Sequence, residues 1–222
     1  MERPVPVADF RVWNHRRAAL VLGCSQHALR PEVASRLPWG MGLWERASGG
    51  GAVLSGPWMV SVSVALPPDH AWVRDGGLEA YRHLGRVHAA TLAGLGIETL
   101  AVPPDAVARA NQRLGGGVPW ACFGSLSPWE LTAAEGRKLV GIAQRKQRNG
   151  VLLVAGTLCH PPEWSLLCDA MGFPGDAVSL QRVTVACDAL ADRRFSAGML
   201  AVRLRRALAR ELWPPARSSP AV

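Results

Sequence analysis

Extended and helical patterns alternate along this chain, and their alternation limits the possible folds more than any other feature of the sequence. Residues 59–66 are rich in valine and alternate between apolar and small polar side chains, as a β-strand does. Residues 78–95 instead repeat large side chains at helical spacing, and Gly96 follows where a helix commonly ends. Composition also favours strands at residues 97–102 and 151–155. The mixture predicts an α+β fold, in which helices flank a mixed β-sheet.

Two β-hairpins are expected from pairs of short apolar segments. Residues 10–13 and 18–23 surround a polar turn, which is typical of a hairpin. Residues 131–133 and 139–143 flank a second turn, where Gly136 can adopt the backbone conformation that a tight turn needs.

The C-terminal region, residues 196–213, has the pattern of an amphipathic helix. Leucine recurs every four residues from Leu200 to Leu212, and arginines stand between the leucines. A shorter helix is expected over residues 31–36, and the tail from Pro214 is expected to fray.

Length and composition are those of an ordinary globular protein. The chain has 222 residues, so residues 1–222 are expected to form a single domain. No apolar run approaches the roughly 20 residues of a membrane span, and no signal peptide is apparent, so we expect a cytoplasmic protein without a membrane partner. The five cysteines include no Cys-x-x-Cys pair, which predicts free thiols and no metal site.

The net charge of +8 favours an acidic binding partner. The basic C-terminal helix fits nucleic-acid binding in composition, but no recognition motif accompanies it. We therefore expect no nucleic acid among the partners.

Two local features point to chemistry. Gly49, Gly50 and Gly51 form either a plain connecting loop or a cradle for a ligand, and they match neither a P-loop nor a dinucleotide fingerprint. Lys138 follows a hairpin turn and enters an apolar strand. Such a lysine either extends its ammonium to solvent, or is desolvated and binds something.

Three blocks together resemble the lipoate/biotin protein ligase superfamily: residues 46–53, residues 136–145 and residues 156–158. The resemblance covers roughly residues 8–165 and implies the catalytic-domain fold of that family. The family usually has a helix before the first hairpin, and this chain starts without it. Its glycine loop usually ends in His-Asp, where this chain has Ser55-Gly56.

The stretch from Cys122-Phe123 through Trp129-Glu130 to Lys138 most resembles cysteine-dependent octanoyltransferases, beside lipoate-protein ligase A-like proteins. The resemblance implies that Cys122 is the nucleophile and that Lys138 favours its thiolate, which is the reactive form of cysteine. Backbone N–H groups of the glycine loop or of the Cys122 loop are expected to hold the oxyanion. The residues expected to bind substrate are Trp13, Arg46, Ser48, Gly49, Gly50, Gly51, Gly141, Gln144, Gly156 and Thr157.

The implied reaction moves an octanoyl or lipoyl group from a thioester donor to a lysine of a lipoyl domain, without a cofactor. The donor would be acyl carrier protein or another acyl carrier. One alternative is an ATP-dependent lipoate-protein ligase, which would need ATP and magnesium. Such ligases usually have Asn-Asp where this chain has Trp129-Glu130, and a glutamate there would repel a nucleotide phosphate. Another alternative is a non-catalytic lipoyl-binding subunit.

Overall fold

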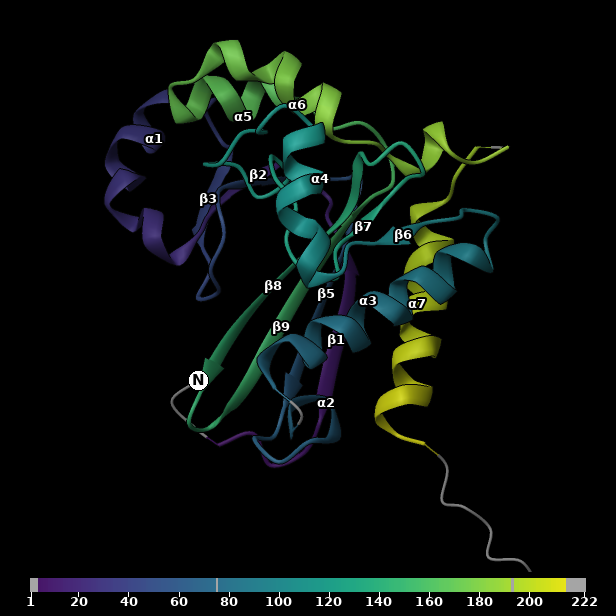
Figure 1. Cartoon of the computed structure of the whole chain (residues 1–222). Helices are drawn as coiled ribbons and strands as arrows, with labels where there is room; N and C mark the ends of the chain where they lie inside the picture. Colours follow the sequence, from purple (N-terminus) through teal and green to yellow (C-terminus); the bar gives the residue numbers. More distant parts are fainter. Residues whose placement is uncertain (1–3, 75, 193, 215–222) are drawn as a thin grey trace, which may run out of the picture.

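The computed structural model describes residues 4–74, 76–192 and 194–214, and its centre is a six-stranded antiparallel sheet (Figure 1). Its strands lie in the order β1-β5-β9-β8-β7-β6. The two longest strands, β8 and β9, form a hairpin, and β5 pairs along the other edge of β9. The strands are β1 (Asp9–Asn14), β5 (Met59–Leu66), β6 (Leu100–Ala101), β7 (Leu131–Thr132), β8 (Lys138–Gln147) and β9 (Gly150–Leu158).

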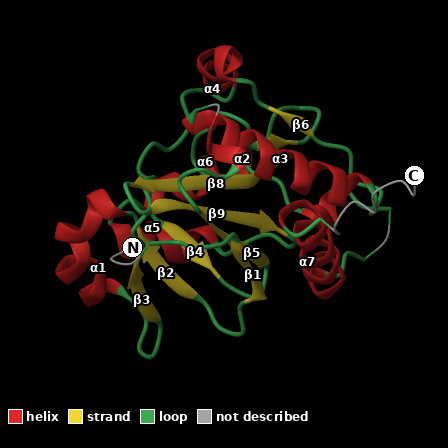
Figure 2. Ribbon diagram, turned by 90° about the horizontal axis from the view of Figure 1, so that it is seen from below, coloured by secondary structure: helices red, strands yellow, loops and turns green. Residues whose placement is uncertain are grey.

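Helices α3 (Gly77–Ala93) and α7 (Ala197–Leu212) cover one face of this sheet (Figures 1 and 2). The alternation of β5 places Val60, Val62 and Val64 in the core beneath the helices. The regularly spaced leucines of α7 are buried in the same core, and the hydroxyl of Ser196 caps the helix by accepting a hydrogen bond from the backbone N–H of Met199. The opposite face of the sheet is therefore free to form a second layer.

A three-stranded sheet, in the order β3-β2-β4, forms part of that second layer. Strand β2 (Ala19–Leu22) is parallel to β3 (Gly42–Glu45) and antiparallel to β4 (Val53–Ser55). A separate core cluster lies between this sheet and nearby helices. The remaining helices are α1 (Arg30–Arg36), α2 (Ala71–Arg74), α4 (Val107–Arg113), α5 (Trp164–Met171) and α6 (Ala177–Val183), with 3-10 turns at Cys24–Leu29, Pro104–Ala106, Pro174–Asp176 and Cys187–Ala189.

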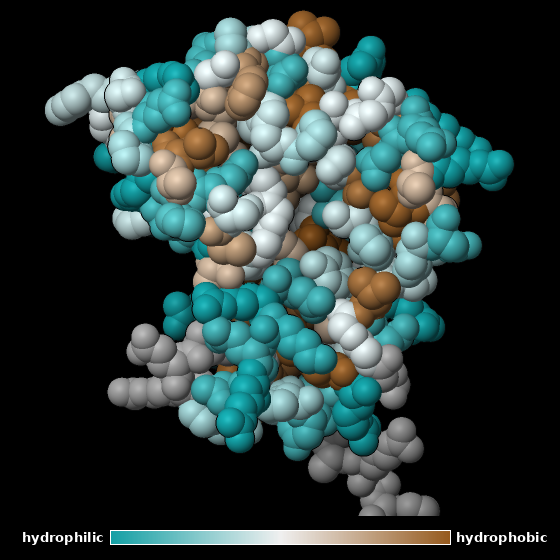
Figure 3. Space-filling view, turned by 60° about the vertical axis from the view of Figure 1, so that its left-hand side comes forward, coloured by the Kyte–Doolittle hydropathy of each residue, from teal (hydrophilic) through white to brown (hydrophobic). Residues whose placement is uncertain are grey.

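On the face shown in Figure 3, hydrophobic residues lie in separate patches between hydrophilic ones, and the surface is hollowed near its centre. Within the described residues, no helix is both long and apolar enough to cross a membrane.

Most of the expected elements are confirmed, including the α+β class, the short helix over residues 31–36, both long helices and the strands β5 and β9. The hairpin around Gly136 is also confirmed, and Gly136 has a φ of 91°, a value that favours glycine. The strand expected over residues 97–102 shrinks to Leu100–Ala101, at the edge of the sheet and two residues before Pro103. The tail beyond Pro214, expected to fray, lies outside the described residues.

The first expected hairpin is wrong. Strand β1 pairs with β5, in a register that places Trp13 opposite Ser61, whereas β2 pairs with β3 and β4. The polar turn between the two segments carries the chain from one sheet to the other. The physical reason is burial: pairing with β5 lets Val12 join the core under the helices, and β2 instead buries Leu20 and Leu22 in the other core cluster.

Candidate active site

The loop that carries Cys122 is tied to the end of the glycine loop by a short parallel bridge. The backbone N–H of Ala52 donates to the carbonyl of Trp120 at 2.9 Å, and the N–H of Cys122 donates to the carbonyl of Ala52 at 2.8 Å. The two chains approach so closely at Gly51 that a Cβ atom there would lie 2.2 Å from the Trp120 carbonyl oxygen. Glycine is therefore required sterically at this position.

Arg46 shapes the glycine loop from inside. Its Nη2 atom donates to the carbonyls of Gly49 at 2.9 Å and Gly51 at 2.7 Å, and Nη1 donates to Val21 at 3.4 Å. Gly50 has a φ of 92°, which lets the loop turn tightly around the guanidinium. The arginine thus holds the loop through main-chain carbonyls.

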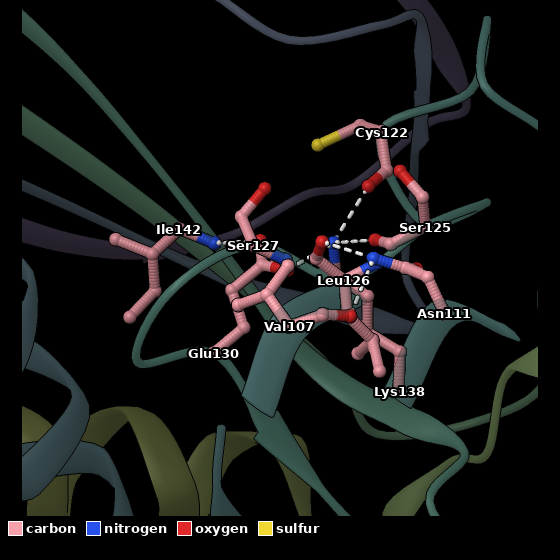
Figure 4. Close-up of polar contacts among 9 residues, drawn as sticks. All are labelled: Val107, Asn111, Cys122, Ser125, Leu126, Ser127, Glu130, Lys138 and Ile142. Atoms are coloured by element: carbon pink, nitrogen blue, oxygen red, sulfur yellow. Dashed lines mark hydrogen bonds and ion pairs between the residues drawn. The ribbon is translucent and has the colours of Figure 1, made fainter. Parts of the chain in front are cut away.

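The Lys138 ammonium is buried beneath the Cys122 loop (Figure 4). It donates to the carbonyls of Cys122 at 2.7 Å and Ser125 at 2.8 Å, and it lies 2.6 Å from Oε2 of Glu130. An ammonium has three hydrogens, so these three acceptors satisfy it completely. Of the two possibilities for this lysine, the structure shows desolvation with specific partners.

Glu130 completes the same network. Its carboxylate accepts hydrogen bonds from the backbone N–H of Ser127 at 2.7 Å and of Ile142 at 2.8 Å (Figure 4). Burial raises the pKa of the Glu130 carboxyl, and the adjacent Lys138 ammonium opposes that rise. The side chain is only 2% exposed, so the charge that was expected to repel a nucleotide phosphate is instead buried against a lysine.

A third anchor comes from helix α4. The side chain of Asn111 accepts from the backbone N–H of Leu126 at 2.8 Å and donates to the carbonyl of the same residue at 2.9 Å. The far end of the Cys122 loop is therefore also held by hydrogen bonds (Figure 4).

Cys122 lines a cavity of about 180 Å³ whose walls come from both sheets and are mainly apolar. Its floor includes the neighbouring glycines Gly141 and Gly156, which face each other across β8 and β9. A Cβ atom at Gly156 would lie 3.0 Å from the sulfur of Met59. The lining residues are Trp13, His15, Val21, Arg46, Val53, Ser55, Met59, Ser61, Val62, Cys122, Phe123, Gly141, Ile142, Ala143, Val154, Ala155 and Gly156.

The structure thus brings part of the expected site together. Trp13, Arg46, Gly141 and Gly156 share the cavity wall with Cys122. Trp13 is 38% exposed, so it is not a core residue.

The other expected site residues lie outside the cavity wall. Gln144 is three positions after Gly141 on β8, and Thr157 is one position after Gly156 on β9. Because successive side chains of a strand point to opposite faces, both residues turn toward the helix-covered face. Ser48 is buried beside the glycine loop. The three loop glycines and Lys138 also do not line the cavity. Gly51 and Lys138 contact the Cys122 loop instead, whereas Gly50 lies against Gly23.

Sequence reasoning missed His15 and Ser61 on the cavity wall. The Nε2 atom of His15 lies 2.8 Å from the hydroxyl of Ser61. The signal for Ser61 was available, because it alternates with the buried valines of β5 and therefore belongs to the opposite face. His15 lies just beyond the end of β1, where no periodic pattern applies.

Comparisons with known proteins agree with this fold and with the predicted resemblance. The family model of the lipoyl protein ligase A/B catalytic domain matches residues 6–174. The chain is 31% identical to the octanoyltransferase LipM of Brevibacillus brevis, in an alignment that covers 80% of this chain. It is 30% identical to the octanoyltransferase LipM of Staphylococcus aureus, in an alignment that covers 79% of this chain. It spans about three fifths of the length of these relatives, 63% and 62% respectively.

Solved structures show the same fold at lower identity. A lipoate-protein ligase A bound with ATP aligns with a TM-score of 0.64 and 19% identity, covering 92% of this chain and 72% of that one. The bi-partite lipoate protein ligase of Thermoplasma acidophilum, from a study that includes its E2 lipoyl domain, aligns with a TM-score of 0.65 and 16% identity, covering 95% and 73%. The chain belongs to the lipoyl protein ligase A/B catalytic domain family.

Proposed function

We propose that this chain is an octanoyltransferase of protein lipoylation, with Cys122 as its nucleophile. The observation that carries the proposal is the position of Cys122, on the wall of a mainly apolar cavity and on a loop anchored along its length. A mainly apolar cavity suits an acyl chain. The LipM relatives, octanoyltransferases by name, support the choice of octanoate.

The chemistry proceeds by two exchanges at one carbonyl carbon. The Cys122 sulfur attacks the donor thioester, a new thioester forms, and the donor thiol leaves. The amine of the acceptor lysine then attacks the enzyme thioester, an amide forms, and the Cys122 thiol is released. The acyl group arrives already activated, so the reaction requires no ATP and no other cofactor.

Lys138 acts in this proposal as a positioning residue. Its bonds go to the carbonyls of Cys122 and Ser125, so it fixes the direction in which the loop presents the thiol. The N–H of Cys122 already donates to Ala52 and is not available to an oxyanion. Of the donors expected for the oxyanion, the other backbone amides of the Cys122 loop, which lines the cavity, and those of the glycine loop remain.

The proposed acceptor is the lysine of a lipoyl domain, and the proposed donor is an acyl carrier protein. The acceptor is supported by the octanoyltransferase relatives and by the ligase that was studied with an E2 lipoyl domain. The net charge of +8 suits carriers with acidic surfaces. A nucleophilic thiol persists in a reducing compartment, so we place the reaction in the cytoplasm.

The test is transfer from octanoyl-carrier protein to a purified lipoyl domain, with and without ATP. The proposal expects a lipoyl domain heavier by one octanoyl group, at a rate that ATP does not change. Pyrophosphate released in proportion to octanoylated or lipoylated domain, from free acid and ATP, would identify a ligase instead. Absence of transfer under both conditions would contradict both enzymatic functions.

A further inference from the structure

The hydrogen bonds of Lys138 leave the proposed reaction without an evident proton acceptor. Attack by a thiol, and later by an amine, releases a proton that some group must accept. The Lys138 ammonium is saturated by two carbonyls and a carboxylate, and both charged side chains of that pair are only 2% exposed. Losing its proton would leave Glu130 as an unpaired buried charge, which is costly. The lysine is therefore poorly suited to exchange protons during turnover.

Among the described residues that line the cavity, three have ionisable side chains: His15, Arg46 and Cys122. Arg46 is permanently protonated and engaged with the carbonyls around the glycine loop. Cys122 is the group that gives up a proton. His15 is thus the lining residue that can accept and return a proton near neutral pH.

The geometry of His15 suits that task. Its Nε2 atom pairs with the hydroxyl of Ser61 at 2.8 Å, and its ring packs edge-on against Trp13 with the centroids 6.0 Å apart. Nδ1 has no hydrogen-bond partner among residues 4–74, 76–192 and 194–214. When Nε2–H donates to Ser61, Nδ1 is therefore a free acceptor.

Burial lowers the pKa of His15, so the imidazole is in its neutral form at neutral pH and has a nitrogen that can accept a proton. The other charged or titratable groups that line the same cavity are Arg46 and Cys122. Among the described residues, no carboxylate lines this cavity to favour the imidazolium.

We propose that His15 is the proton-transfer residue of this active site, a role that rests on the transferase function proposed above. As the Cys122 sulfur bonds to the thioester carbon, the thiol proton moves to His15. The bond from that carbon to the donor sulfur then breaks, and His15 returns the proton to the leaving thiolate. In the second half, the acceptor amine gives a proton to His15 as the amide forms, and His15 passes it to the departing sulfur of Cys122.

The test is single-turnover acylation of Cys122 by octanoyl-pantetheine, followed by mass spectrometry from pH 5.5 to 9. In the wild type, the rate should rise as His15 loses its proton, and the midpoint of that rise should lie below 6.5, the ordinary histidine pKa, because burial lowers the pKa of His15. In His15→Gln, the rate at pH 7 should fall about 10²-fold, the scale of a lost general base, and the rise in rate that accompanies deprotonation of His15 should be absent. His27→Gln, at an exposed histidine, is the matched control and should behave as the wild type.

A second variant separates proton transfer from structure. His15→Ala should recover part of its rate when imidazole is added, and the recovery should follow the neutral form of imidazole. Wild-type acylation rates in His15→Gln at every pH would overturn the role of His15 alone. A wild-type protein that forms no octanoyl adduct at all would overturn the transferase function, and with it this inference.

Discussion

Lys138 Nζ lies 2.6 Å from Oε2 of Glu130, and both side chains are only 2% exposed. Glu130 directly precedes β7 and Lys138 is the first residue of β8, and between them they bind four main-chain groups. A family lysine that sequence reasoning assigns to thiol activation is in this structure the anchor of the loop that carries the thiol.

Replacing one partner of this pair should destabilise the protein. Lys138→Met leaves the Glu130 carboxylate buried without its counter-charge, so the free energy of unfolding should fall by about 3–5 kcal/mol. Acyl transfer should fall at least about 10²-fold, because the Cys122 loop loses its anchor. The double variant Lys138→Met with Glu130→Gln removes the unpaired charge and should recover stability without recovering activity. Urea unfolding and transfer assays on the same preparations measure both effects, and a fully active Lys138→Met protein would refute the anchoring role.

The glycine loop offers a matched pair of substitutions. Gly51→Ala should displace the Cys122 loop, because the new Cβ would lie 2.2 Å from the Trp120 carbonyl oxygen. Gly49→Ala meets no atom within 4 Å and should leave transfer close to the wild-type rate. Steady-state transfer rates and thermal melting of the two variants test this difference. Equal activity in both would show that the close approach at Gly51 does not set the position of Cys122.

Helix α7 should contribute strongly to stability through its inner face. Leu208→Ala removes a fully buried side chain and should cost about 2–5 kcal/mol of unfolding free energy. Val202 is 44% exposed on the same helix, so Val202→Ala should change stability by less than about 1 kcal/mol. Denaturant titrations of both variants give the comparison, and a small effect at Leu208 would mean that α7 is only loosely docked.

Stability should also depend on pH through His88, which is completely buried in α3. Burial lowers the pKa of His88 to about 4, from 6.5. Above pH 6.5, His88 is neutral in both the folded and the unfolded state, so its ionisation does not change the free energy of unfolding. As pH falls from 6.5 toward 4, the unfolded chain takes up a proton that the folded chain does not, so about 3 kcal/mol of stability is lost. His88→Leu should lack this component of the slope between pH 7 and pH 4, whereas His27→Gln should keep it.

Local sequence patterns predicted the helices and strands of this fold better than they predicted which strands pair with one another. The leucine repeat of α7 and the alternation of β5 each depend on which face is buried, and both were visible in the sequence. The pairing of β1 with β5, almost fifty residues away, depends on the shared core under the helices and left no local trace.

The candidate site likewise contains residues that sequence motifs identify and residues whose roles depend on the tertiary structure. Cys122, Arg46 and Gly141 were found through motifs, and strand alternation would have excluded Gln144 from the cavity had the register been known. Glu130 was recognised as a charge, but its pairing with Lys138 depends on how the hairpin folds. Similarly, His15 enters the cavity because the chain crosses between two sheets directly after β1.

The most direct test of the proposed function is the intact mass of the protein after incubation with octanoyl-carrier protein, without ATP. We predict one added octanoyl group, located on Cys122 by peptide mapping, and its loss when a lipoyl domain is supplied as acceptor. Cys122→Ser should keep the circular dichroism spectrum of the wild type and acquire no adduct. An unmodified wild-type protein, or a Cys122→Ser variant that still transfers octanoate at the wild-type rate, would contradict a mechanism through Cys122.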